Sequence, residues 1–431
     1  MNELFLQRVK EYFKDDADAY LHSLNEPCTQ AFFLNTEKAS REEILSLIDF
    51  PYEGSVFTKD SFYHHNDNIG KSRAYELGLI YPQEIAASLT SAFVNTEDVN
   101  LIVDLCAAPG GKTINILNRV RGDAICICND VSHSRALTLS SNLERLGLDR
   151  VVVTNKKSED LADLLEEKAD IVILDVPCSG EGMIRKYPEI LETYSLKNIE
   201  NLAQIQSDLL EQAYRILKQG GQLIYSTCTY AFEEDENQII SFLRRHEDMK
   251  LCEIDMPSYS KLKGTVKLCP LNDTEGQFFA LLKKDGTKEK ASLSFMKNTR
   301  DKTVEDFIRE NLILDEYELY QNNEHFYLSL KKLPDLKSGI LKCGIYLGDV
   351  VKKRFEPAHD LYRSNSLKGK FRYTYDLNDE EYMTFISGNQ LKADLEDHYY
   401  QITYRGYSLG YGKSGSGYIK NKYPKGLRRM I

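Results

Sequence analysis

The sequence predicts an α/β fold whose centre is a mostly parallel sheet, with an α+β extension before it and a β-rich module after it. In the middle of the chain, short and continuously apolar segments alternate with helical patterns of roughly 10–18 residues, which is typical of parallel strands covered on both faces. The apolar segments are LIVDL (101–105), AICIC (124–128), VVVTN (151–155), DIVILDV (170–176), QLIYST (222–227) and QFFALLKK (277–284).

The first part of the chain lacks this alternation. EEILSLI (42–48) has helical spacing, and EGSVFTKDSFYHHNDNIG (53–70) has the pattern of short strands and turns. We therefore expect an N-terminal extension over residues 1–95, before a sheet-forming domain over residues 96–285.

Composition indicates the remaining boundaries. Around KKDGTKEKAS (283–292) the chain becomes polar, which predicts a linking region over 286–334. Tyrosine and short strand patterns then dominate, so we expect a separate β-rich module over 335–431. Within the sheet domain, NLAQIQSDLLEQAYRILK (201–218) is an amphipathic helix that the following Gly220 and Gly221 are expected to end.

Hydrophobic residues make up 42% of the 431 residues and charged residues 28%, which predicts a sizeable core. No apolar run approaches the roughly 20 residues of a membrane-spanning helix. The first residues lack the pattern of a secretory signal. We therefore expect a cytoplasmic protein with no membrane partner.

The nine cysteines are odd in number and irregular in spacing, and no CxxC pair occurs. This pattern argues against a disulfide framework and a structural zinc site, so we expect no metal. A cysteine is by default a small buried side chain, and only its local context can give it another role.

The formal net charge of -11 counts against nucleic acid as a partner, because phosphate binding needs Lys and Arg. Residues 401–431, however, contain no Asp or Glu. This segment is either a solvated basic tail or an RNA-binding surface that adds base stacking to phosphate neutralisation, and we favour the surface. Its basic residues include Lys413, Lys420, Lys422, Lys425, Arg428 and Arg429, and its tyrosines are Tyr404, Tyr407, Tyr411, Tyr418 and Tyr423.

A glycine turn follows the first predicted strand in LCAAPGGKT (105–113), where Gly110 and Gly111 permit positive φ. Asp130 follows the next strand, at the place where an acid typically accepts hydrogen bonds from ribose. A plain turn without a ligand is the simplest alternative. A phosphate loop of the GxxxxGK[ST] type fails because Cys106 stands where its first glycine should be, and GxGxxG is absent. S-adenosylmethionine, a nucleoside without phosphate, remains.

Two cysteines follow neighbouring predicted strands. Cys178 lies in LDVPCSGEGM (174–183), close to Asp175, and Cys228 lies in YSTCTY (225–230). A thiolate that adds to carbon 6 of cytosine makes carbon 5 reactive toward a methyl sulfonium. A carboxyl group near the base edge can orient the base and stabilise the adduct. The residues alone do not decide which cysteine attacks.

These motifs, with GQFFALLKK (276–284), resemble the RNA cytosine-5 methyltransferase family of the Nol1/Nop2/Sun type over roughly residues 75–285. YPQEIAASL (81–89) is similar to the segment that precedes this domain. LGYGKSGSGYIKNKYPKGLRR (409–429) resembles the PUA-like module of the bacterial RsmF-type enzymes, which act on cytosines of small-subunit ribosomal RNA. The resemblance implies a Rossmann-like class I methyltransferase domain and a monomer that acts on ribosomal RNA or the small subunit.

The resemblance also implies site residues. Cys228 would be the nucleophile and Cys178 would assist release of the methylated RNA, whereas Asp175 would contact both cofactor and cytosine. Asp130 would hold the ribose, and Asn155 or Lys157 stands where the family often has an acid near adenine. The residues around the methionine part of the cofactor would be Cys106, Ala107, Ala108, Pro109, Gly110, Gly111 and Lys112.

Several alternatives stay open. In the DNA cytosine-5 enzymes the nucleophile is the Pro-Cys cysteine, which corresponds to Cys178. An amino-group methyltransferase would need an Asp/Asn-Pro-Pro-Tyr loop, and DVPCSG has a cysteine at the second proline. The substrate could be transfer RNA or large-subunit ribosomal RNA, and a non-catalytic RNA-binding assembly factor is a further alternative.

Overall fold

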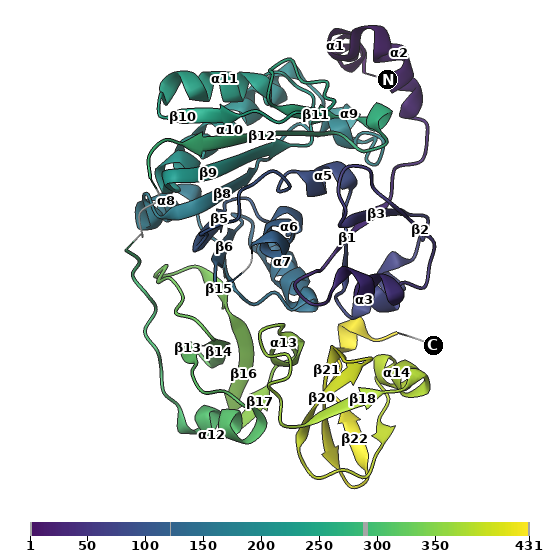
Figure 1. Ribbon diagram of the computed structural model, residues 1–431, viewed down its shortest axis with the longest axis vertical. Helices are drawn as coiled ribbons and strands as arrows, with labels where there is room; N and C mark the ends of the chain where they lie inside the picture. The colour runs from purple at the N-terminus through teal and green to yellow at the C-terminus, as the bar shows by residue number, and fades with distance from the viewer. Residues whose placement is uncertain (1, 121, 288–291, 430–431) are drawn as a thin grey trace.

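The computed structural model describes residues 2–120, 122–287 and 292–429. Its centre is a sheet with helices on both faces, and the C-terminal module lies beside the later part of the N-terminal extension, away from the first two helices (Figure 1). Within the described ranges, no helix is long and apolar enough to cross a membrane.

The central sheet has nine strands, eight of them in the order β10-β12-β9-β8-β5-β6-β7-β15, and β11 pairs with β12. The strands from β9 to β7 are parallel, and β12 is antiparallel to β9. All six predicted segments are strands of this sheet, which confirms the α/β prediction. They are β5 (Leu101–Asp104), β6 (Ile125–Asn129), β7 (Val151–Thr154), β8 (Ala169–Asp175), β9 (Leu217–Thr227) and β12 (Gln277–Lys284); β10 is Met249–Cys252 and β11 is Val266–Leu268.

Successive residues of the parallel strands pack into two different layers, because side chains alternate between the faces of a sheet. Ile102 packs against helices α6 (Gly111–Arg119) and α7 (His133–Leu146). Its neighbour Val103 packs on the other face, against the second set of helices. That set is α8 (Ser158–Leu165), α10 (Leu196–Ile216) and α11 (Glu236–Arg245).

The predicted end of the long helix is wrong. Helix α10 ends at Ile216 and passes directly into β9, so Gly220 and Gly221 lie inside the strand. Ala169 pairs with Leu217 but Ile171 pairs with Gln222, so β9 has three extra residues at this point. Gly220 has a φ of +71°, and the glycines therefore form the irregularity that realigns the strand rather than a helix cap.

The N-terminal extension begins with α1 (Glu3–Phe13) and α2 (Ala17–Ser23) and continues as an antiparallel sheet in the order β2-β3-β1-β4. The helix predicted over 42–48 is confirmed as α3 (Arg41–Ser46), and Ser40 and Glu43 form its capping box. The strands are β1 (Ala31–Leu34), β2 (Tyr52–Gly54), β3 (Ser61–His64) and β4 (Ile80–Pro82), and α5 (Ile85–Leu89) leads into the central domain.

The chain after the central domain forms two further sheets. Residues 288–291 of the predicted linker lie outside the described residues. The first sheet follows α12 (Lys302–Asn311) and has the order β13-β14-β16-β17, whereas β15 (Ile340–Cys343) leaves it and pairs antiparallel with β7 of the central sheet. Its strands are β13 (Glu318–Asn322), β14 (His325–Ser329), β16 (Ile345–Val351) and β17 (Arg354–Pro357).

The last sheet, in the order β18-β20-β21-β22-β19, confirms the β-rich C-terminal module. It shares one hydrophobic core with the N-terminal extension, in which Phe32 and Leu34 belong to the same cluster as Ile402 and Tyr404. The sheet of the N-terminal extension and the C-terminal module therefore stabilise each other. The elements are α13 (His359–Arg363), β18 (Thr374–Leu377), α14 (Asp379–Ile386), β19 (Leu391–Lys392), β20 (Tyr399–Tyr404), β21 (Tyr407–Gly415) and β22 (Tyr418–Asn421).

Candidate active site

The two predicted cysteines meet at the carboxyl edge of the sheet. Strands β8 and β9 are parallel neighbours, and Asp175 pairs with Ser226, so the loops that follow them leave the sheet side by side. The Sγ atoms of Cys178 and Cys228 are 3.2 Å apart, and both residues are half-buried. The backbone N–H of Cys228 also donates to the Cys178 sulfur at 3.3 Å.

A buried carboxylate holds the Cys178 loop in place. Glu234 Oε2 accepts hydrogen bonds from Ser179 N at 3.0 Å and from Gln206 Nε2 at 2.7 Å. The same Gln206 nitrogen donates to the Pro177 carbonyl at 2.9 Å, so the loop is held on both sides of the cysteine. Burial raises the pKa of Glu234 to about 7. Glu234 and Gln206 were not predicted, because no motif or spacing links α10 or the segment after β9 to the Cys178 loop.

An ion pair lies next to the thiols. Lys112 Nζ, from the start of α6, is 2.8 Å from Asp175 Oδ2, and Ser226 Oγ donates to Asp175 Oδ1 at 2.7 Å. Burial by itself lowers the pKa of Lys112, but the Asp175 carboxylate outweighs burial and raises it. The ammonium group therefore stays charged beside Cys228.

The two thiols differ in acidity. The hydrogen bond with Cys178 lowers the pKa of Cys228, burial and Asp175 oppose that effect, and the Lys112 ammonium adds to it. The same hydrogen bond, together with burial, raises the pKa of Cys178 well above its usual range. In this arrangement Cys178 keeps its proton and Cys228 is the better thiolate.

The predicted cofactor loop borders a cavity of about 180 Å³ at the same edge of the sheet. The loop is fixed from outside by Arg135 Nη2, which donates to the Ala108 carbonyl at 2.6 Å, and by Asn142 Nδ2, which donates to the Pro109 carbonyl at 2.9 Å. The cavity is lined by Tyr81, Pro82, Gln83, Ala87, Asp104, Cys106, Ala107, Ala108, Pro109, Gly111, Lys112 and Asp175.

The two glycine positions of the loop exclude a side chain for different reasons. Gly110 has a φ of +118°, as expected, which L side chains rarely adopt. Gly111, by contrast, does not adopt a positive φ. A Cβ there would lie 2.7 Å from Gln83 Nε2, so Gly111 leaves room for the side chain of Gln83, which exchanges two hydrogen bonds with Asn115.

The hydrogen bonds around Asp130 indicate whether the site fits S-adenosylmethionine. Its Oδ1 accepts from Ser132 N at 2.9 Å, whereas its Oδ2 is buried without a hydrogen-bond partner and lies 3.4 Å from Arg135 Nη2. Asp104, which lines the cavity, also has a buried oxygen without a hydrogen-bond partner. Unsatisfied buried acceptors are costly, and hydroxyl and amine donors of a nucleoside and amino-acid ligand would satisfy them. The residues fit the group.

Asn155 supports Asp130 rather than standing free. Its side-chain amide donates to the carbonyls of Asp130 and Val131, both at 2.8 Å, so it fixes the turn that carries the acid. A contact between Asn155 and adenine stays a prediction.

All but one of the predicted basic C-terminal residues are exposed, but most of the tyrosines are not. Arg429 is half-buried and pairs with Glu76 at 2.5 Å. Tyr418 is 46% exposed, whereas four tyrosines point into hydrophobic cores, so the expected surface of stacking tyrosines is wrong for them. The exposed basic residues are Lys413, Lys420, Lys422, Lys425 and Arg428, and the buried tyrosines are Tyr404, Tyr407, Tyr411 and Tyr423.

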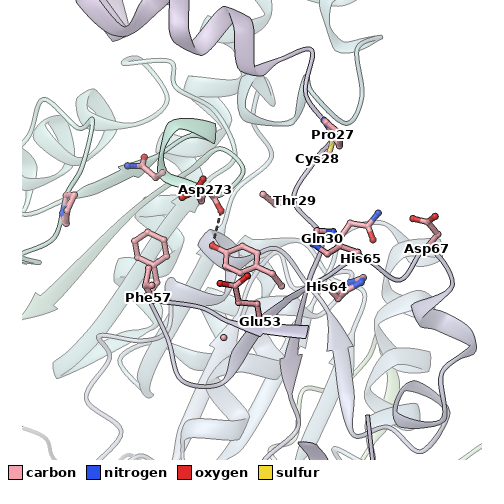
Figure 2. A pocket seen from close by; sticks show the side chains of 15 residues that line it. Pro27, Cys28, Thr29, Gln30, Glu53, Phe57, His64, His65, Asp67 and Asp273 are labelled. Carbon is pink, nitrogen blue, oxygen red and sulfur yellow. Dashed lines mark hydrogen bonds between the residues drawn. The ribbon is translucent and has the colours of Figure 1, made fainter. Parts of the chain in front are cut away.

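A larger cavity, of about 820 Å³, lies between the N-terminal extension and the central domain (Figure 2). The Tyr63 hydroxyl crosses from β3 and donates to the Asp273 carbonyl at 2.9 Å. Glu53, His64 and Asp67 also line this cavity, and its described lining contains no Lys or Arg. The chemistry predicted from the sequence belongs to the smaller cavity, because that one contains Asp175, Lys112 and the glycine loop.

All nine cysteines are free, and no three metal-binding side chains cluster within the described parts of the chain. The strand order, the glycine loop after β5 and the acid after β6 define the class as an S-adenosylmethionine-dependent methyltransferase with a Rossmann-like fold. The chain matches the family described as 16S rRNA methyltransferase RsmB/F over residues 91–283.

Three further domain families match most of the remaining chain. The N-terminal domain of 16S rRNA methyltransferase RsmF matches residues 1–85, the first C-terminal domain of RsmF matches 294–363, and the RsmF PUA domain matches 372–429. The chain belongs to the RsmB/F family and is an RNA methyltransferase, which confirms the resemblance seen in the sequence.

Relatives agree with this assignment. The ribosomal RNA small subunit methyltransferase F of Shewanella oneidensis is 26% identical, over 95% of this chain and 93% of the relative. The tRNA (cytosine(49)-C(5))-methyltransferase of Pyrococcus abyssi is 33% identical, over 64% of this chain and 95% of the relative.

Solved structures agree as well. A methyltransferase homologue from Pyrococcus horikoshii has a TM-score of 0.59 at 26% identity, covering 66% of this chain and 95% of that one. NSun6 from the same organism has a TM-score of 0.58 at 24% identity, covering 66% and 98%, and shows the shared fold.

Proposed function

We propose that this chain methylates carbon 5 of a cytosine in small-subunit ribosomal RNA, through a covalent bond between the Cys228 sulfur and carbon 6 of the base. The observation that carries the proposal is the pair of thiols 3.2 Å apart, next to the Lys112–Asp175 ion pair. Each of these residue types is common. Together, two thiols, an acid and a cation at the carboxyl ends of β8 and β9 provide a nucleophile, a group that can orient the base and a cation that stabilises the thiolate.

Carbon 5 of cytosine is too weak a nucleophile to take a methyl group unaided. The Cys228 thiolate attacks carbon 6, a carbon–sulfur bond forms, and the electron pair of the 5,6 double bond makes carbon 5 enamine-like. When bound, S-adenosylmethionine supplies the electrophilic methyl group. Loss of the carbon 5 proton to a base then returns the electron pair to the ring, and the carbon–sulfur bond breaks to release Cys228.

The acidity difference between the thiols supports these roles. Cys178 shares a hydrogen bond with Cys228 that lowers the pKa of Cys228, which raises the fraction of thiolate ready for attack. When the carbon–sulfur bond breaks, the neighbouring Cys178 can again donate to the departing sulfur. A hydrogen bond from Cys178 to the departing sulfur would assist release of the product. We therefore assign release to Cys178 and attack to Cys228.

Asp175 and Lys112 support the base and the thiolate. Lys112 pairs with Asp175 Oδ2 and Ser226 holds Asp175 Oδ1, so the carboxyl group has a fixed orientation at the strand tip. In that orientation Asp175 can accept a hydrogen bond from the exocyclic amine of the base, which stabilises the adduct.

Full-length similarity favours ribosomal RNA as the substrate. Relatives named ribosomal RNA small subunit methyltransferase F match 95–100% of this chain, whereas the relative named for transfer RNA matches 64% of it. With a ribosomal substrate, we propose that the enzyme acts in the cytoplasm and as a monomer.

The test compares two cysteine variants, incubated with labelled S-adenosylmethionine and small-subunit ribosomal RNA, either free or in assembled subunits. Cys178→Ala should accumulate a denaturation-resistant protein–RNA adduct, because attack survives while release is impaired. Cys228→Ala should form no adduct and transfer no methyl group.

Cys252→Ala, which removes another half-buried thiol, is the matched control and should resemble the unmodified protein. Release of tritium from RNA labelled at carbon 5 of cytosine separates carbon 5 from amine methylation, because only the first displaces the hydrogen at carbon 5. An adduct on the Cys228→Ala protein would reverse the roles of the thiols, and methyl transfer without any adduct would exclude the covalent route.

A further inference from the structure

A second electrostatic site lies where the N-terminal extension, the central domain and the C-terminal module meet. Lys38 follows β1 by four residues and is 7% exposed. Its Nζ atom is buried and has no hydrogen-bond partner in the described part of the chain. Burial, with repulsion from Arg363, Arg145 and Lys368, lowers the pKa of Lys38 well below its usual range.

The nearby arginines do not compensate Lys38. Arg363 donates to the carbonyls of Ser408, Glu76 and Arg145, and Arg145 donates to the carbonyls of Tyr75 and Ile80. These are neutral acceptors, so the positive charges remain. Nitrogen atoms of both arginines are also buried without a hydrogen-bond partner, although the Arg145 guanidinium lies over the Tyr75 ring at 3.7 Å.

Other buried lysines of the chain are treated differently. Lys267 pairs with Asp235 and Glu236 at 3.0 and 2.8 Å, and Lys218 pairs with Asp170 at 2.5 Å. A buried charge is normally paired, because leaving it alone costs several kcal/mol. Lys38 therefore departs from the pattern of this protein's own structural lysines.

Lys38 lines a cavity of about 390 Å³ that is rich in hydrogen-bond donors. Lys368 lies on its rim, and the loop continues with Lys370 and Arg372. One acid, Asp376, is also present, and its Oδ1 already accepts from Thr403 Oγ1 and Gly406 N. The lining is Lys38, Arg363, Ser364, Asn365, Lys368, Gly369, Thr374, Asp376, Gln401, Thr403, Gly406, Tyr407 and Ser408.

We propose that this cavity binds a phosphate group of the RNA backbone. The negative charge of the phosphate balances the positive charges of Lys38, Arg363 and Lys368. The proposal rests on the RNA substrate proposed above and adds a contact far in sequence from the reacting thiols. The cavity in Figure 2 offers a contrast, because its described lining has the acids Glu53, Asp67 and Asp273 and no Lys or Arg.

The first test uses Lys38→Met and inorganic phosphate, without RNA or cofactor. The variant should have an unchanged or higher Tm than the unmodified protein, because it removes an unpaired buried charge and keeps the side-chain length. Phosphate should raise the Tm of the unmodified protein, and this rise should be absent in Lys38→Met. A lower Tm of the variant, with no phosphate effect in either protein, would mean a purely structural lysine and would overturn the proposal.

The second test measures RNA binding across salt concentrations. Lys38→Met should weaken binding about 3- to 10-fold and lower the salt slope by roughly 0.7–0.9, the value for one lost phosphate contact. Lys38→Arg should keep most of the slope. Lys263→Met, which removes an exposed lysine paired with Glu253 at 3.2 Å, is the control and should change neither quantity.

An unchanged slope in Lys38→Met would exclude an RNA phosphate, even if inorganic phosphate binds. These outcomes are independent of the cysteine experiment. If cytosine methylation fails but phosphate protects the protein through Lys38, the proposed function is wrong and the site stands. If Cys228 forms the adduct and Lys38 has no effect in either test, the proposed function stands and the phosphate site is wrong.

Discussion

Two lysines of this protein, the half-buried Lys112 and the buried Lys38, have opposite electrostatic surroundings. At the strand-tip site, Lys112 pairs with Asp175 at 2.8 Å, and that carboxylate raises its pKa in spite of burial. At the domain junction, Lys38 has no carboxylate partner among the described residues, and burial and neighbouring cations lower its pKa. Lys112 has its anionic partner within the protein, whereas Lys38 gains one when the phosphate ligand binds.

The difference teaches how charge is used in the two places. A paired cation orients a reacting group before the substrate arrives, so its removal should affect chemistry. An unpaired cation destabilises the free protein and gains its partner on binding, so its removal should affect affinity. The Lys38 experiment tests the second half of this comparison, and the following predictions test or extend the rest.

The largest effect is expected for Lys112→Met. Asp175 would lose its ion pair and Cys228 would lose a cation that lowers its pKa, so kcat for methyl transfer should fall about 10²- to 10³-fold. The alkylation of Cys228, followed by mass spectrometry against pH, should shift to higher pH. Lys250→Met, at an exposed ion pair with Asp285, is the control. A loss smaller than a few-fold would show that the pair is not part of the chemistry.

An intermediate effect is expected for Asp104→Asn, measured on the protein without ligands. Burial raises the pKa of Asp104 to about 7, so the folded protein holds a proton that the unfolded chain loses near its ordinary value of 3.8. The free energy of unfolding of the unmodified protein should therefore fall as pH rises from about 4 to 7. Each pKa unit corresponds to about 1.4 kcal/mol.

Asparagine does not titrate, so the Asp104→Asn protein should lack this decline and gain stability relative to the unmodified protein between pH 5 and pH 8. Urea unfolding at the two pH values measures the difference. Asp163→Asn, at an exposed ion pair with Arg215, is the control. An equal pH trend in the two proteins would show that burial does not raise the pKa of Asp104.

The smallest effect is expected for the exposed lysines of the C-terminal module. Lys420→Met with Lys422→Met should reduce RNA affinity only a few-fold and lower the salt slope by up to about 0.7–0.9 per phosphate contact. Filter binding across salt concentrations measures both. Deletion of residues 401–431 is not a clean test, because β21 and β22 and most of β20 would be lost from a shared core. An unchanged slope would remove these lysines from the RNA surface.

The sequence predicted the elements whose signals are local. The six apolar segments became strands because each is a short run buried on both faces, and Asp130 and the glycine loop followed from their place after two of these strands. Gly220 and Gly221 misled the prediction, since the same residues serve as a helix stop and as a strand irregularity. The buried C-terminal tyrosines misled it too, because composition does not show which face of a strand meets a core.

By itself, the sequence determined the α/β fold and the family, and it indicated the candidate reacting groups, since these depend on periodicity and short motifs. Only the tertiary structure decided the 3.2 Å approach of Cys178 and Cys228, the support of their loop by Glu234, and the isolation of Lys38. Such contacts join residues tens to hundreds of positions apart. Whether a charge is paired depends on which side chains packing brings within a few ångströms, and no pattern along the chain records that distance.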